Sequence, residues 1–449
     1  MSFRFVPLGS LLRDKGYIRG PFGSALKRGE MKQMGTPVYE QQHAIDGTRS
    51  FRFFIDDDKL DELKRFAVKT HDLIISCSGT VGRISVIRPG DPFGVISQAL
   101  LILRPDLEAL SPTFLYYVLR SPQGQAELLK ASHGAVQQNI APRSVVEQIP
   151  IPLPDLKTQD EISEVLKAID DRITLLRETN ATVEAIAQAL FKSWFVDFDP
   201  VRAKMEGRIP EGMDEATAAL FPAGLEESEL GLVPRGWKPL SVSEVAEIVK
   251  GKSYSSKDLV TEHETALVTL KSFARGGGFR LDGFKPYSGI YKGSQVVVSG
   301  DLIVAYTDVT QAAELIGKPA IVIGVDEHKT LVASLDVGII RPLRAQASRQ
   351  FLYGLFKTGA FQAHTLSHTS GTTVLHLSKD GVGSYRFACP PIAVVEAFST
   401  IGESLTSRQQ VNIDQMRNLA TIRDTLLPRL ISGQLRLTEA LAELELEPA

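Results

Sequence analysis

The chain has 449 residues, of which 43% are hydrophobic, and a formal net charge of −3 at pH 7. This length suits two globular domains with connectors. No apolar run approaches the ~20 residues of a membrane span, and "MSFRFVPLGS" at the N-terminus lacks the apolar core of a signal peptide. The two cysteines, Cys77 and Cys389, have no partner at metal-ligand spacing. We therefore expect a cytoplasmic protein with no membrane contact and no zinc site.

The second half of the sequence repeats the first at an offset of 237 residues. No gap is needed between residues 97–154 and 334–391. Identical matches include Ser97 with Ser334, Arg104 with Arg341, Phe114 with Phe351, Gln125 with Gln362, and Pro154 with Pro391. The sequence therefore predicts two copies of one unit, a globular part followed by a long helix. A pseudo-twofold molecule of this kind is expected to treat its target as two half-sites.

Both globular parts predict a mixed α/β fold. Residues 72–87 predict two strands around a turn at Gly79 and Gly82, and residues 95–105 predict a further strand. Residues 111–132 predict a helix that Pro122 and Gly124 can divide, and the Pro-rich residues 147–154 suit a sheet edge or an extended exit from the domain. The second copy predicts counterparts at 300–310, where the offset is 229, and at 331–342, 348–366 and 385–391.

Residues 158–195 predict a long helix with one apolar seam. Its members recur at steps of three and four over four heptads: Ile162, Leu166, Ile169, Ile173, Leu176, Asn180, Val183, Ala187, Leu190 and Trp194. The polar member, Asn180, is expected to fix the helix register at a cost in stability. A weaker seam follows at 392–427, where Pro428 is expected to end the helix. We expect the two helices to pair as an antiparallel coiled coil within the chain.

The predicted segments differ in charge. Residues 1–155 form the first globular domain, 156–196 the first long helix, 197–237 a Pro-, Gly- and acid-rich connector, 238–391 the second domain, 392–427 the second long helix, and 428–449 the C-terminal tail. Net charge is +3 for 1–155, −7 for 156–237, +4 for 238–391 and −3 for 392–449. Small imbalances are common, but the basic bias occurs in both copies, which favours a polyanionic target for the globular domains.

Motifs for catalysis are scarce. The sequence has no phosphate loop, no G-x-G-x-x-G after a strand, and no Asn-Pro-Pro-aromatic motif of adenine methyltransferases. Glu62 and Lys64 have the spacing of half a nuclease site, but "DDDKLDELKR" reads better as a solvated helix face. His364, His368 and His376 are clustered without a zinc motif. We expect no catalytic residue, no metal ligand and no reaction catalysed by this chain alone.

Several strings resemble one family over the whole chain. "AIAQALFKSWFVDFDPV" (185–201), "LFPAGLEESELGLVPRGW" (220–237), "LLPRLISGQLRL" (426–437) and "GAVQQNIAP" (134–142) are similar to the specificity (S) subunit of Type I restriction–modification systems. The resemblance implies two target recognition domains, each reading half of a split, asymmetric DNA site, and a helical spacer that sets the gap. It also implies docking of two methyltransferase (M) subunits and, through the complex, restriction (R) subunits. S-adenosylmethionine, ATP and Mg would then be bound by those partners and not by this chain.

Candidate contacts to double-stranded DNA are basic and polar residues in loops. In the first domain they are Thr80, Arg83, Gln137, Gln138 and Asn139 for base edges, and Arg19, Lys27 and Arg28 for phosphates. In the second domain they are Lys252, Lys257, Lys271, Arg275, Arg280, Lys285, Thr372 and Thr373. For any single cation among them, a solvated surface charge is the more common explanation, and "QQNI" could be a structural turn that caps a helix.

Two other functions remain open from the sequence. One is a DNA methyltransferase or nuclease with an unrecognised active site. The other is a helical scaffold that binds no DNA, which would explain the helices but not two basic domains.

Overall fold

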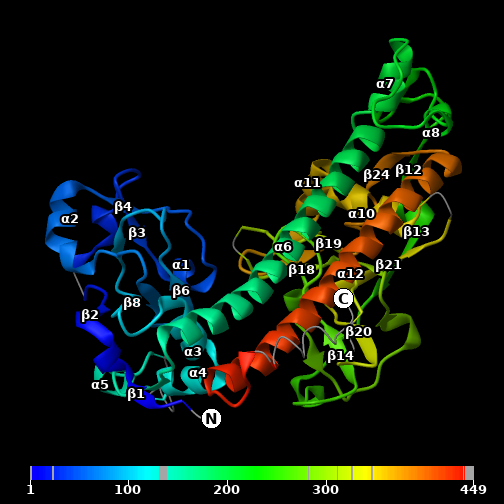
Figure 1. Ribbon diagram of the computed structural model, residues 1–449. Helices are drawn as coiled ribbons and strands as arrows, with labels where there is room; N and C mark the ends of the chain where they lie inside the picture. The colour runs from blue at the N-terminus through cyan, green and yellow to red at the C-terminus, as the bar shows by residue number, and fades with distance from the viewer. Residues whose placement is uncertain are drawn as a thin grey trace. The chain divides into compact units, whose positions relative to one another are not determined.

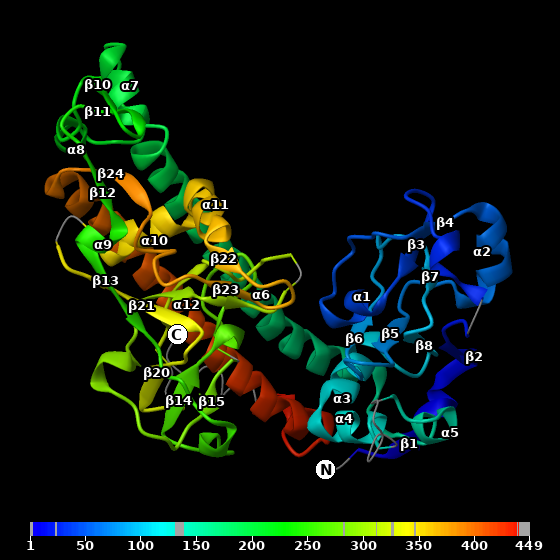
Figure 2. The same cartoon turned by 180° about the vertical axis from the view of Figure 1, so that it is seen from behind.

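The computed structural model describes residues 3–22, 25–130, 139–281, 283–310, 312–324, 327–344, 347–437 and 439. Figures 1 and 2 show the chain from opposite sides. It divides into two compact units: unit 1 comprises Met1–Leu176 and Gln415–Ala449, and unit 2 comprises Arg177–Asp414. None of the helices in the described parts of the chain is both long and apolar enough to cross a membrane.

Unit 1 contains two sheets and a short ladder. The antiparallel four-stranded sheet has the order β2 (Leu12–Arg19), β8 (Leu100–Pro105), β5 (Leu73–Ser76), β6 (Ile84–Val86). A second sheet has the order β4 (Phe54–Ile55), β3 (Thr36–Tyr39), β7 (Val95–Ile96), with β3 and β7 parallel. β1 (Phe5–Pro7) pairs with β9 (Pro150–Pro152). The short helices are α1 (Gln41–Ile45), α2 (Asp57–Leu63), α3 (Pro112–Arg120), α4 (Pro122–Leu128) and α5 (Arg143–Val146).

Unit 2 repeats this topology. Its antiparallel sheet has the order β13 (Ala246–Lys250), β21 (Val337–Pro342), β17 (Leu302–Ala305), β19 (Pro319–Ile321). The second sheet has the order β15 (Lys285–Pro286), β14 (Thr265–Val268), β20 (Thr330–Ala333), β16 (Val296–Val297), with β14 and β20 parallel. β12 (Lys238–Ser241) pairs with β24 (Arg386–Cys389), as β1 does with β9. Helices α9 (Val242–Val245), α10 (Arg349–Lys357) and α11 (Gly359–Ser367) complete this domain.

Three features were not expected from the sequence. The predicted strand at 95–105 is divided into β7 and β8, which lie in different sheets, and β20 and β21 divide 331–342 in the same way. Unit 2 also has a three-stranded sheet of β18 (Thr307–Asp308), β23 (Leu375–Leu377) and β22 (Thr369–Ser370). The connector is not wholly irregular, because it forms α7 (Asp199–Met205), α8 (Glu215–Ala219) and a hairpin of β10 (Leu225–Ser228) and β11 (Gly231–Pro234).

The same ion pair lies in the core of each domain. The guanidinium of Arg104 contacts the carboxylate of Asp72 at 2.7 Å, and that of Arg341 contacts Asp301 at 2.9 Å. The two aspartate side chains are 0% and 1% exposed. A carboxylate so deeply buried requires an opposite charge and hydrogen bonds to offset its desolvation. The two domains therefore share a polar framework as well as a strand order.

The two long helices contribute to the core of both units. In unit 1, Leu166 of α6 (Leu156–Phe195) packs in one apolar cluster with Leu427 and Leu430 of α12 (Ile392–Ile431). In unit 2, the other end of α6 packs against the start of α12, with the rings of Phe191 and Phe398 5.6 Å apart. Residues later in α6 contact residues earlier in α12. The two helices therefore run antiparallel. The predicted seam residues Ile162, Leu166, Ile169, Ile173, Leu176 and Trp194 are buried, and Asn180, Val183 and Leu190 are half-buried.

The second long helix does not end where the sequence suggested. The prediction of a helix over 392–427 ended by Pro428 is wrong, because α12 continues through Pro428 to Ile431. A proline inside a helix removes one backbone hydrogen bond. Leu430 and Ile431 are both buried in the apolar cluster of unit 1, and this burial offsets the lost bond.

A pair of asparagines lies between the helices within unit 2. The side-chain amide of Asn412, which is 0% exposed, donates to Oδ1 of Asn180 at 2.7 Å. The Asn180 amide in turn donates to the carbonyl of Gln409 at 3.2 Å, and the Gln409 amide donates to the carbonyl of Asn180 at 3.3 Å. Sliding either helix by one turn would break all three bonds, so these residues favour one register over its neighbours.

Replacing one asparagine should destabilise unit 2 more than replacing both. Asn180→Leu leaves the buried Asn412 amide without its acceptor, which should cost about 1–3 kcal/mol. The double variant Asn180→Leu/Asn412→Leu removes both polar groups and should recover this loss or exceed the wild-type stability. The midpoint of urea unfolding measures the change, with exposed Thr182→Ala as control. A double variant less stable than Asn180→Leu would contradict this account.

Candidate nucleic-acid interface

The turn between β5 and β6 holds two predicted contact residues in a defined geometry. Gly79 and Gly82 adopt φ angles of 70° and 79°, which side-chain-bearing residues rarely adopt. Ser76 fixes both ends of the turn: its hydroxyl donates to the carbonyl of Thr80 at 2.6 Å and accepts the amide of Arg83 at 2.9 Å. The side chains of Thr80 and Arg83 remain exposed. A backbone held in this way presents them to a ligand with little loss of conformational entropy on binding.

Asn139 lies beside this turn. It forms an isolated antiparallel bridge with Ser78, and the next amide, of Ile140, donates to the carbonyl of Cys77 at 3.1 Å. The structure therefore brings Asn139 together with Thr80, although they are far apart in the sequence. The other two residues of the predicted string, Gln137 and Gln138, lie outside the described residues.

The predicted phosphate contacts of the first domain lie at and after the end of β2. Arg19 is the last residue of β2, is half-exposed and pairs with Leu101 on β8. Lys27 is exposed in the following loop, and Arg28 starts a short 3-10 helix, Arg28–Glu30, in which its side chain is not described. The amide of Gly20, next to Arg19, donates to the carbonyl of Leu100 at 2.9 Å, and the amide of Cys77, just after β5, donates to the carbonyl of Ala99 at 2.8 Å. Arg19 therefore lies close to the start of the β5–β6 turn.

The predicted contacts of the second domain come from several segments of that domain. Lys271, Arg275, Arg280 and Lys257 are exposed, and so are Thr372 and Thr373 between β22 and β23. Arg275 forms an ion pair with Glu314 at 3.3 Å, which partly neutralises it. Lys285 donates to the hydroxyl of Tyr254 at 3.2 Å and lies 5.5 Å from the centre of that ring. These residues are spread over several loops of the domain.

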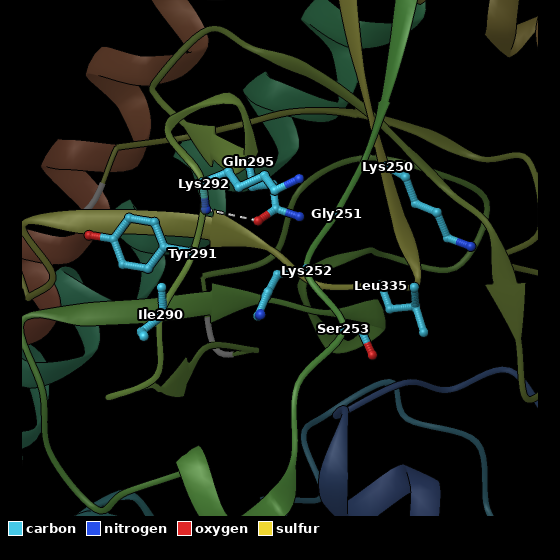
Figure 3. Close-up of a pocket in the computed structure, with 9 residues that line it drawn as sticks. All are labelled: Lys250, Gly251, Lys252, Ser253, Ile290, Tyr291, Lys292, Gln295 and Leu335. Carbon is cyan, nitrogen blue, oxygen red and sulfur yellow. Dashed lines mark hydrogen bonds between the residues drawn. The ribbon is translucent and has the colours of Figure 1, made fainter.

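Sequence reasoning missed a lysine-lined hollow at the end of β13. It has a volume of about 510 Å³ and is lined by Lys250, Lys252 and Lys292 together with Tyr291 and Gln295 (Figure 3). Of these, only Lys252 was predicted. Lys250 pairs with Gly338 on β21, and Arg19 pairs with Leu101 on β8. Leu101 and Gly338 are related by the repeat offset, so Arg19 and Lys250 occupy equivalent positions. Aligning the strand ends at Gly20 and Gly251 would have identified Lys250.

Other candidate chemistry finds no support in the geometry of the described residues. The rings of His364 and His368 lie 4.1 Å apart on α11, whereas His376 is on β23 with its ring nitrogen 3.4 Å from Thr307. Among the described residues no group of three or more His, Cys, Asp or Glu could hold a metal ion. Glu62 and Lys64 lie at the end of α2 and just after it, and both are exposed.

Comparisons with known proteins point to one family. Residues 23–185 match the family model described as the Type I restriction modification DNA specificity domain. The chain is 25% identical over 394 residues to the specificity subunit of the Type I restriction enzyme HindI of Haemophilus influenzae, which covers 76% of this chain and 81% of the relative. It is 24% identical to the MjaIX specificity subunit of Methanocaldococcus jannaschii, over 73% of this chain and 69% of the relative.

Solved structures include one similar along nearly the whole chain. The crystal structure of a Type I restriction–modification S subunit from M. genitalium superposes with a TM-score of 0.48 and 16% identity, and covers 96% of both chains.

The two cysteines should resist thiol reagents while the protein is folded. Burial raises the pKa of the Cys77 thiol to about 12 and that of Cys389 to about 11. The reactive thiolate of Cys77 should then be about a thousandfold rarer at pH 8 than in the unfolded chain. For the same reason, folding stability should fall as the pH rises above about 8.5, where unfolded thiols ionise. Thiol titration with and without denaturant measures this, and rapid labelling of the folded protein would contradict it.

Proposed function

We propose that this chain is a specificity subunit of a Type I restriction–modification system and selects the DNA sequence on which such a complex acts; its similarity to such subunits supports the proposal. Each globular domain reads one half of a bipartite site in double-stranded DNA. The chain acts within a complex, where it docks two methyltransferase (M) subunits and, through them, restriction (R) subunits. The observation that carries this proposal is the duplicated domain with a cation, Arg19 or Lys250, at the same strand end in each copy.

The two half-sites should differ in sequence. In the first domain the β5–β6 turn presents the exposed side chains of Thr80 and Arg83. The corresponding segment of the second domain begins with β18, where Asp308 is fully buried and accepts backbone amides of Leu315 and Ile316 at 2.6 and 2.9 Å. A buried carboxylate that accepts hydrogen bonds from its own loop offers no donor to base edges. The two domains therefore use different side chains, which suits an asymmetric site.

Methylation and cleavage belong to the partner subunits in this proposal. S-adenosylmethionine, ATP and Mg would be bound by M and R, and the chain supplies affinity and sequence choice in the cytoplasm. Phosphate contacts from lysine and arginine give salt-dependent affinity, whereas contacts to base edges give the sequence.

Footprinting of the complex with M should test the proposal. We expect two protected segments separated by an unprotected centre, and methylated adenines only when this chain is present. Purified chain without M should neither methylate nor cleave the same DNA. A single continuous footprint, or methylation by the chain alone, would refute the bipartite reading and favour an enzyme with its own active site. No footprint in the complex would favour a scaffold.

Charge reversal at Arg83 should weaken DNA binding. Arg83→Glu places a carboxylate where the proposal has a DNA contact, and loss of such a contact costs about 1–3 kcal/mol, or roughly five- to 150-fold in Kd. Arg88→Glu is the matched control, because Arg83 directly precedes β6 and Arg88 follows it by two residues, and both are exposed. Electrophoretic mobility shifts at low salt measure the difference. Equal affinity of the two variants would remove Arg83 from the interface.

A further inference from the structure

The hollow at the end of β13 is built by backbone contacts and is not a loose loop surface. The Gly251 amide donates to the carbonyl of Val337 at 3.0 Å, and the Lys252 amide donates to the carbonyl of Ala333 at 2.7 Å. A Cβ atom at Gly251 would lie 2.0 Å from the carbonyl oxygen of Ser334. Only glycine allows the two chain segments to approach so closely. The position of Lys252 is therefore fixed by the sheet.

A second segment supplies the opposite wall. Gly293–Gln295 forms a short 3-10 helix, and the amide of Lys292 donates to Oε1 of Gln295 at 3.0 Å. The oxygen of the Gln295 side chain thus already accepts a hydrogen bond, and its NH₂ group is the part that can donate to a ligand. In Figure 3, Lys252 and Lys292 lie on one side of the segment at Gly251, and Lys250 lies on the other. Lys252, Lys292 and Gln295 all line the hollow, so two cationic side chains and one amide donor border the same space.

The hollow carries positive charge without a matching carboxylate. None of the residues that line it is acidic. Within the described ranges, no aspartate or glutamate forms an ion pair with Lys250, Lys252 or Lys292, although other lysines of the same domain, such as Lys329 and Lys357, do form ion pairs. Like charges gathered without counter-ions raise one another's electrostatic energy, and an anion relieves this cost. The chemistry of the site suits an oxyanion with several acceptor atoms.

We propose that this hollow binds a phosphate of the DNA backbone through Lys252, Lys292 and the Gln295 amide. The inference rests on the proposed function and adds to it a phosphate contact in the second domain that does not depend on the DNA sequence. In the first domain, the residue after the equivalent glycine, Gly20, is Pro21, which is buried and carries no charge. This phosphate contact is therefore specific to the second half-site. It positions that domain on the duplex and reads no base.

The test uses the complex with M, and the double variant Lys252→Gln/Lys292→Gln. Kd is measured over a range of salt concentrations for a duplex with both half-sites and for a scrambled duplex. Loss of one phosphate contact should make the slope of log K against log salt shallower by about one. Affinity should fall by the same factor for both duplexes. Lys238→Gln is the control and should leave the slope unchanged, because Lys238 is an exposed lysine on β12 of the same domain, lies outside the hollow and is not among the predicted DNA contacts.

Each other outcome has a separate meaning. An unchanged slope overturns the phosphate site, and so does a loss confined to the scrambled or the specific duplex, which would indicate base reading. Loss of M from the complex would show that the hollow docks protein. Phosphate-ethylation interference on the wild-type complex gives a result independent of variant folding: one phosphate in the second half-site should be essential, and none would overturn the site. If the wild-type complex does not distinguish the two duplexes, the proposed function itself fails.

Discussion

The packing of each unit depends on helix segments from two distant parts of the chain. The apolar core of unit 1 contains Leu166 from α6 and Leu430 from α12, and that of unit 2 contains Phe191 from α6 and Phe398 from α12. The core of the first domain is therefore complete only when the last helix of the chain is in place. The antiparallel direction of the two helices and the asparagine pair between them select the register in which this packing occurs.

The two duplicated domains share their buried polar contacts and differ in their exposed turns. Arg104 with Asp72 and Arg341 with Asp301 form matching buried ion pairs. Gln125 and Gln362 each donate to two backbone carbonyls at equivalent places. Buried charges and amides tolerate little change, since an unpaired partner in a core is costly. Exposed turns carry no such penalty, so the two domains can present different side chains to two different half-sites.

The sequence predicted part of the candidate interface and missed the rest for a definable reason. Thr80 and Arg83 were found because two glycines in a β-rich segment mark a turn, and the structure adds Asn139 beside it. Lys292 and Gln295 were missed because the hollow joins segments about forty residues apart. Arg275 was selected for its charge alone, and its pairing with Glu314 is visible only in three dimensions. A linear pattern reports residue type and spacing, but not which charges are already neutralised.

By itself the sequence determined the internal duplication, the mixed α/β class, the long helices and the family resemblance, because periodicity and repeated residues are properties of the chain alone. Only the tertiary structure decided where α12 ends, since burial of Leu430 and Ile431 in the core of unit 1 outweighs the effect of Pro428. It also decided that residues 95–105 and 331–342 each serve two sheets. Strand pairing and burial depend on contacts between distant segments, and these contacts outweigh local preference.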